Sequence, residues 1–323
     1  MMKRKLVRQG GSALTLTLPA QWVRDQNLKP GDEIHVLEEG ASIRVSTAAI
    51  DRRVSQVTLQ IDGLNNLTLN RHLDEFYRLG AEEIVLTFQK PFILTYKDGK
   101  IIRIDEYMKE KIDRFIGMEV FSQTSNKMVL QSLLHGEDLE KIEVVRNRIF
   151  FLIKELCGEF LGAMDAEKDF AHFNSVVDLR HENIIKFINY YLRLLNFSHL
   201  PEEQKSRLFS LFTLLGLVLD KVRHTSSRVH EMKKVTPKVS KYLAIIFSYF
   251  LEQFDVILKK NYSLQELGLL IKKRYDLVRT VNQEDFTLEE SRVILESNLL
   301  LNTINEFTTC FAALNLDQYA VKS

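Results

Sequence analysis

The sequence has little cysteine and lacks any long apolar run. Among its 323 residues are two cysteines, Cys157 and Cys310, which have neither the spacing of a metal site nor the number for a disulfide framework. No uninterrupted apolar stretch reaches the roughly 18 residues that a membrane span needs. No apolar segment follows the basic start MMKRKLVRQGG, as it would in a secretion signal. We therefore expect a cytoplasmic protein with no membrane insertion.

An excess of charge of one sign and the common catalytic motifs are also missing. The net charge is +1, so only a local cluster could indicate nucleic acid or a membrane surface as a partner. The chain has no Walker-type loop, no G-x-G-x-x-G, no nucleophile elbow and no H-E-x-x-H. Ser227 lies near His230, but the pattern supplies neither an acid partner nor an oxyanion donor. We therefore expect the protein to have no enzymatic activity.

A small β-rich segment comes first in the chain. In GGSALTLTLPAQW, residues 10–22, leucines alternate with threonines over 14–18 as in a half-buried strand, and Pro19 ends the alternation. AQWVRD, LKPGDEI and EEGASIRV then indicate a short helix, a tight turn into a strand, and a hairpin. The predicted order over residues 1–52 is strand, strand, short helix, strand, strand. So short a segment buries little surface alone, and we expect a homodimer.

Two further zones follow, and together the three predict a multidomain α+β protein. Residues 53–135 predict a small open sheet in the order βαβ-αββ, with helices on one face. Residues 136–323 show helical periodicity, which predicts antiparallel three-helix bundles. The expected helices are 138–165, 170–197, 201–231, 236–260, 263–282 and 287–315. SHLPEEQ and FTLEES place Ser or Thr at the expected N-caps of two of them.

The helical zone shows signs of an internal duplication. LVLDKVRHTSSRVHEM and LLLNTINEFTTCFAAL each close a block of three expected helices, and they align without a gap. The alignment places Asp220 against Asn302 and His224 against Glu306. Matched polar positions within an apolar face are more informative than shared apolar periodicity, so we expect two repeats.

Basic residues are concentrated near the start of the chain. The first thirty residues contain six basic residues and a single acidic one, which leaves the remainder acidic. On a strand, Arg4 and Arg8 would share a face, and a dimer would double the charge presented to phosphates. No segment here is long enough for a helix-turn-helix reader, so a β-rich reader is the candidate, with a merely solvated basic terminus as the alternative. The candidate DNA-contacting residues are Lys3, Arg4, Lys5, Arg8 and Arg24.

The N-terminal segment resembles a known family. RKLVRQGGSALTLTLPAQWVRDQNLKPGDEIHVLEEGASIRV is similar to the swapped-hairpin AbrB/SpoVT family, with its basic strand, G-x-S-x-x-I-T-L-P-x-x-W, G-L-x-x-G-D-x-V and final hairpin. The resemblance implies that two chains exchange hairpins into one barrel and that basic residues contact duplex DNA. The family also includes antitoxins and modules that chiefly dimerise.

The helical zone resembles a second family. LDKVRHTSSRV is similar to the L-E-R-I-G-D-H-A-x-N-I motif of PhoU, the phosphate-uptake regulator, whose fold is two three-helix repeats. Archaeal proteins that join an AbrB-like head, a βαβ-αββ middle and a PhoU tail match the whole order. The resemblance implies that Asp220 and His224 take the places of a metal-binding acidic pair. DLRHENIIKF would supply Asp178 and Glu182 from a neighbouring helix, with His181 adjacent.

Two departures weaken this implied metal site. Ile185 stands where the second motif expects an aspartate, and Asn302 replaces an acidic residue in the second repeat. A site of six oxygen ligands is therefore not expected, and a mixed N/O site for Zn, Mn or Fe stays open. We expect the isolated protein to hold no tight metal.

The combined prediction is a homodimeric DNA-binding transcriptional regulator of the PhoU type, linked to phosphate uptake. Its parts are a head at 1–52, a middle domain at 53–135 and a helical domain with two repeats at 136–323. The alternative is a PhoU-like interaction protein that acts on a phosphate transporter or a sensor kinase and uses its head only to dimerise.

Overall fold

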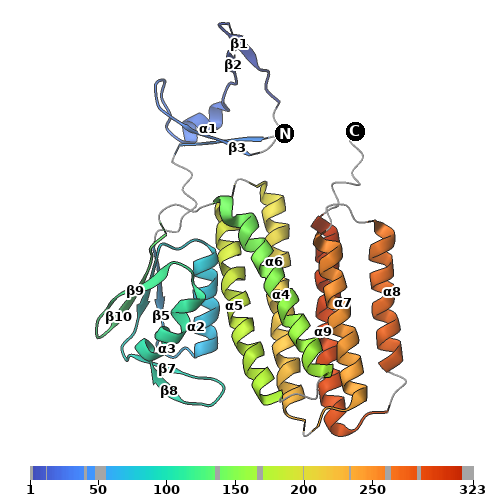
Figure 1. Ribbon diagram of the computed structural model, residues 1–323. Coiled ribbons are helices and arrows are strands. Elements are labelled where there is room, and N and C mark those ends of the chain that lie inside the picture. The colour runs from blue at the N-terminus through green and yellow to red at the C-terminus, as the bar shows by residue number, and fades with distance from the viewer. Residues whose placement is uncertain are drawn as a thin grey trace. The chain divides into compact units, whose positions relative to one another are not determined.

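The chain forms two compact units, Met1–Arg52 and Arg53–Ser323, which are described separately (Figure 1). The computed structural model describes residues 3–11, 13–39, 42–47, 56–134, 139–165, 170–198, 200–232, 234–258, 263–281 and 285–314. The expected boundaries after residues 52 and 135 fall outside the described residues, so the division into three domains stays a prediction. Within the described ranges, no helix is long and apolar enough to cross a membrane.

The first unit has the predicted order of elements. Strands β1 (Val7–Gln9) and β2 (Ala13–Thr15) pair antiparallel, and β3 (His35–Glu39) pairs antiparallel with β4 (Ser42–Ser46). The short helix α1 (Ala20–Asp25) lies between the two hairpins.

The predicted long alternation in the first unit is wrong in its extent. Strand β2 ends at Thr15, so Leu16 and Leu18 lie beyond it, and Arg4 precedes β1 rather than sharing a strand with Arg8. With only three residues in each strand, the β1–β2 hairpin is shorter than the leucine–threonine alternation. Pro19 occupies the N-cap of α1, where its missing N–H costs the helix nothing.

An α/β part opens the second unit. Its sheet has the order β5-β6-β10-β9, with β5 parallel to β6 and the other pairs antiparallel. Helix α2 (Asn66–Arg78) makes the crossover from β5 to β6, and the Asn65 side chain accepts a hydrogen bond from the Thr68 N–H at 3.0 Å to start it. Helix α3 (Ile104–Lys111) continues into the 3₁₀ turn η1 (Ile112–Arg114). The strands are β5 (Gln56–Gln60), β6 (Glu83–Thr87), β9 (Met118–Gln123) and β10 (Lys127–Ser132).

The βαβ-αββ prediction omits one hairpin. Strands β7 (Phe92–Leu94) and β8 (Ile101–Arg103) pair antiparallel between β6 and α3. Each strand has three residues, too few to show a clear period of two in the sequence. In β7 the side chain of Ile93 is buried in the core, and its two neighbours are exposed. The turn residue Gly99, at a φ of +66°, is the signal that could have revealed it.

Six long helices fill the remainder of the described chain, each within a few residues of its predicted range. They are α4 (Ile142–Asp165), α5 (Phe170–Phe197), α6 (Glu202–His230), α7 (Pro237–Leu258), α8 (Leu264–Val281) and α9 (Leu288–Leu314). Thr287 and Glu290 form the expected capping box, with the Thr287 N–H donating to Glu290 at 2.8 Å. The other expected cap is wrong, because Pro201 occupies the N-cap of α6 and the Ser198 hydroxyl donates to the Leu195 carbonyl instead.

The six helices pack as two consecutive triplets. Helix α4 packs against α7 and α6 against α9, while α5 and α8 are the outer helices of the six, each packed against the other two helices of its own triplet (Figure 1). Equivalent helices of the two triplets therefore meet each other, as a duplicated unit with an internal two-fold relation would arrange them.

The α/β part is joined to the helices through α5. The buried Arg193 donates to the carbonyl of Tyr77 in the last turn of α2 at 3.0 Å and to that of Ala81, between α2 and β6, at 3.1 Å. Gly80 has a φ of +89°, and a Cβ there would lie 2.2 Å from the ring of Phe197. Helix α5 thus belongs to the cores of both parts of this unit.

Candidate functional site

The basic residues of the first unit are at its surface. Lys3, Arg4 and Lys5 precede β1, while Arg8 lies on β1 opposite Leu14, and all four side chains are exposed. Exposed cations at a surface are placed to contact phosphates.

Arg24 differs from the other four. It lies in the last turn of α1 and donates to the Gln21 side chain at 2.8 Å, and Gln21 in turn donates to Asp25 at 2.8 Å. These two hydrogen bonds hold the guanidinium against α1 next to a carboxylate. We therefore expect Arg24 to contribute less to phosphate binding than Arg4 or Arg8.

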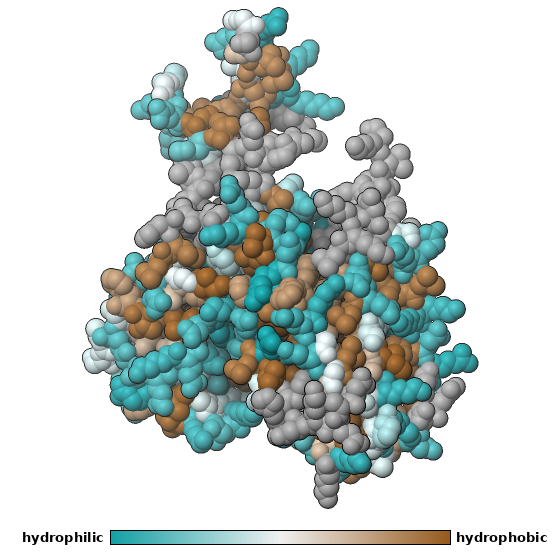
Figure 2. Space-filling view, in the orientation of Figure 1, coloured by the Kyte–Doolittle hydropathy of each residue, from teal (hydrophilic) through white to brown (hydrophobic). Residues whose placement is uncertain are grey.

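The apolar residues of the first unit are exposed as well. Helix α1 has no buried residue, and six large apolar side chains are 53–67% exposed, which Figure 2 shows as brown surface on this unit. These residues are Leu6, Val7, Leu14, Leu16, Val36 and Ile43. Monomeric proteins rarely leave so much of a small domain's apolar surface in water, so these side chains are available to pack against a partner.

A polar cluster lies between α5 and α6 in the second unit. The His181 side chain, in a residue only 2% exposed, has its Nε2 2.9 Å from Asp220 Oδ1 on α6 and its Nδ1 3.6 Å from Glu182 Oε1. Arg114 of η1 lies 3.2 Å from Glu182, and Arg223 lies 3.5 Å from Asp220. Each carboxylate therefore has both an imidazole and a guanidinium beside it.

The four residues proposed for metal do not all meet. Glu182 and Asp220 flank His181, but the His224 Nδ1 faces α9, 3.6 Å from Glu296 Oε1. Asp178 is exposed on α5. Among the residues that the structure describes, no three His, Cys, Asp or Glu side chains form a metal-holding group.

His181 is the central residue of this cluster, and the sequence indicated it only as a neighbour of the proposed ligands. The second triplet places a related contact at the aligned position, because Arg274 of α8 donates to Asn302 of α9 at 2.7 Å. In both triplets the residue at this position, Asp220 or Asn302, bonds a side chain of the preceding helix. This shared contact supports the duplication.

The cluster shifts the pKa values of its members. Burial alone would lower the pKa of His181, but the hydrogen bond with Asp220 and the nearby Glu182 carboxylate outweigh it and raise that pKa. Burial opposes ionisation of Glu182, yet His181 and the Arg114 charge lower its pKa to about 2. The pKa of Asp220 is lowered by the same histidine and by Arg223, against its burial.

The stability of the second unit should therefore depend on pH through His181. Because its folded pKa is raised, its stabilising contribution is complete below the unfolded value of about 6.5 and is lost as the pH rises through the folded pKa. We expect Asp220→Asn to lower the free energy of unfolding by about 1–3 kcal/mol at pH 6, because it removes the negative charge beside the protonated, buried imidazole, and by less at pH 8.5.

Urea unfolding at the two pH values measures this difference. Asp178→Asn is the matched control, since Asp178 is an exposed carboxylate on the same helix as His181, and it should change little. A loss for Asp220→Asn that is the same at both pH values would contradict the proposed role of the charged imidazole.

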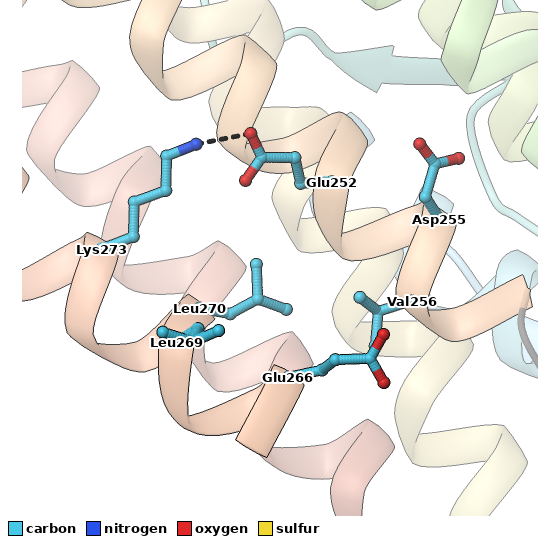
Figure 3. Close-up of a pocket in the computed structure, with 7 residues that line it drawn as sticks. All are labelled: Glu252, Asp255, Val256, Glu266, Leu269, Leu270 and Lys273. Atoms are coloured by element: carbon cyan, nitrogen blue, oxygen red, sulfur yellow. Dashed lines mark hydrogen bonds and ion pairs between the residues drawn. The ribbon is translucent and has the colours of Figure 1, made fainter. Parts of the chain in front are cut away.

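A groove of about 310 Å³ between α7 and α8 is lined by carboxylates (Figure 3). Each of them already has a partner: Glu252 pairs with Lys273, Asp255 with Lys154, and Glu266 accepts from the backbone N–H of Ser263. The Glu252–Lys273 pair joins α7 to α8, while Asp255 pairs with α4 and Glu266 caps the start of α8, so each carboxylate of the groove is already engaged.

Comparison with known proteins finds a similarity in the first unit. Residues 7–50 match the model of a family described as antidote-toxin recognition MazE, bacterial antitoxin. The match supports the AbrB-like head and covers β1 to β4 but none of the long helices. No curated protein and no solved structure matches the chain. A domain of this type indicates a DNA-binding or antitoxin-like regulator.

Proposed function

We propose that the protein is a DNA-binding transcriptional regulator whose head works as a homodimer in the cytoplasm and catalyses no reaction. The observation that carries the proposal is that the first unit exposes both its basic residues and its large apolar side chains. A second copy would cover the apolar residues and double the cations along one surface. The MazE-type match over residues 7–50 supports this arrangement.

Binding of the full-length protein to duplex DNA over a range of salt concentrations tests the proposal. Several phosphate contacts from two subunits should make the association constant fall steeply with salt. Dimerisation without measurable duplex binding at low salt would reject DNA binding. It would favour the alternative, in which the head only dimerises.

The finer part of the proposal concerns the helices, which we assign to a PhoU-type body linked to phosphate uptake. Its support is the duplicated arrangement of α4–α6 and α7–α9, with equivalent helices packed together and related contacts at Asp220 and Asn302. In this assignment the helical body senses the regulatory signal, and the head binds DNA.

The second candidate function is binding to a partner protein, which would be a phosphate transporter, a sensor kinase or a toxin-like protein. The description of the matched family, which names toxin recognition, favours it for the first unit. In this second function the head only dimerises and does not bind DNA. The salt-dependent DNA assay therefore distinguishes the two functions.

The polar cluster of the body does not fit a tight metal site. The His181 Nε2 is already used by Asp220, and Arg114 and Arg223 neutralise the two carboxylates that a cation would need. We expect elemental analysis after chelator-free purification to find no stoichiometric transition metal. Stoichiometric metal that disappears in His224→Ala or His181→Asn, and not in Asp276→Asn, would overturn this expectation.

A further inference from the structure

A cavity of about 430 Å³ lies at one end of the helical part, where α4 and α6 begin and α5 ends. Its volume falls within the range of about 300–1,000 Å³ that is typical of small-molecule sites. The lining includes Ile142, Leu200, Leu208, Arg146, Tyr191 and Gln204. None of these residues takes part in the His181 cluster or in the groove between α7 and α8.

Tyr191 gives the cavity a hydroxyl donor. The residue is 2% exposed, and its ring lies against Phe212 with the ring centroids 4.0 Å apart. Among the residues that the structure describes, none accepts a hydrogen bond from its hydroxyl. Burial raises the pKa of this hydroxyl, so it stays protonated. A hydroxyl that lines a cavity and has no partner among the described residues is available to a ligand.

Arg146 gives the cavity a positive charge. Its Nε is buried without a hydrogen-bond partner, and its terminal nitrogen pairs with Glu143 one turn earlier on α4. The Glu143 side chain is 61% exposed, so it can turn into water at small cost. An incoming anion would take its place on the guanidinium.

The remaining groups set the kind of molecule that fits. Ser198 donates its hydroxyl proton to the Leu195 carbonyl, which leaves its oxygen as an acceptor at the cavity wall. Gln204 is exposed at the mouth, and Ile142, Leu200 and Leu208 supply apolar walls. From this arrangement we infer that the cavity binds a small organic anion, with its carboxylate or phosphate group on Arg146 and Tyr191 and its apolar body against Ile142 and Leu208.

Isothermal titration of the full-length protein with benzoate, phenyl phosphate and inorganic phosphate tests this inference. Benzoate or phenyl phosphate should bind, and whichever binds more tightly identifies the anionic group. Inorganic phosphate should bind more weakly because it has no apolar body. Arg146→Gln and Tyr191→Phe should each weaken binding by about ten- to a hundredfold, the effect of losing one hydrogen bond to a charged group. Glu143→Gln should tighten it several-fold, because it removes the competing carboxylate.

Controls separate this site from adventitious binding. Arg148→Gln removes an equal charge from α4 at a residue that lies over Phe151 and outside the cavity, and it should leave binding unchanged. Circular dichroism confirms that each variant is folded, and Tyr191→Phe keeps the contact with Phe212. Absence of binding by both aromatic anions at millimolar concentration would overturn the inference. So would binding that persists in Arg146→Gln and Tyr191→Phe. Neither result bears on DNA binding by the head.

Discussion

Replacing Arg4 and Arg8 together with alanine is expected to weaken binding to every duplex and to reduce the salt slope by roughly 2 to 4. Both arginines are exposed in the first unit, and Arg8 lies on β1. Two subunits contribute four such side chains. Each lost phosphate contact removes about 0.9 from the slope of log K against log salt, because one fewer counterion is released.

The measurement is fluorescence anisotropy with a labelled duplex between low and moderate salt. Lys97→Ala with Lys100→Ala is the matched control, because it removes the same charge from exposed positions in the second unit. The control should keep the wild-type slope, and the melting temperature of the helical part should not change in either variant. An unchanged slope for the arginine variant would place these side chains away from the phosphates.

Sequence periodicity predicts the helical part well, since long amphipathic segments repeat their pattern over many turns. The ends of α4 to α9 fall within a few residues of the expected ranges for that reason. The β7–β8 hairpin was missed because strands of three residues show too little alternation to stand out. The opposite error occurs at β2, because the leucine–threonine alternation continues past Thr15, where the strand ends.

The candidate site was harder to predict, because it depends on which faces of different helices meet. A spacing of four residues places Asp178 and Glu182 near one another on α5, but the helix turns Asp178 to solvent and His181 inward. His224 is one turn from Asp220, yet it faces α9 while Asp220 faces α5. Arg114 comes from the α/β part, and no local pattern in the sequence connects it with Glu182.

The head is expected to be an obligate dimer. Its apolar side chains are more than half exposed within one chain, although full burial of each would stabilise the fold by about 1.5–3 kcal/mol. A unit of this size has little other stabilisation to replace that amount. A fragment of residues 1–52 should therefore sediment as a folded dimer or be unfolded, and a folded monomer would contradict the prediction.

Leu14→Ala tests the same point in the full-length protein. Leu14 lies on β2, and its side chain is 63% exposed in the single chain, so in a paired head the second copy would cover it. We expect the variant to lose about 2–5 kcal/mol of head stability, the cost of truncating a buried leucine, and to dissociate at higher concentration than the wild type. Leu179→Ala, at a leucine that is 75% exposed on α5, is the control and should change neither property. Equal and small effects of the two substitutions in sedimentation equilibrium would show that Leu14 is as exposed in solution as in the single chain. The first unit would then have no shared core, and the doubling of its cations, on which the salt dependence of DNA binding rests, would lose its physical basis.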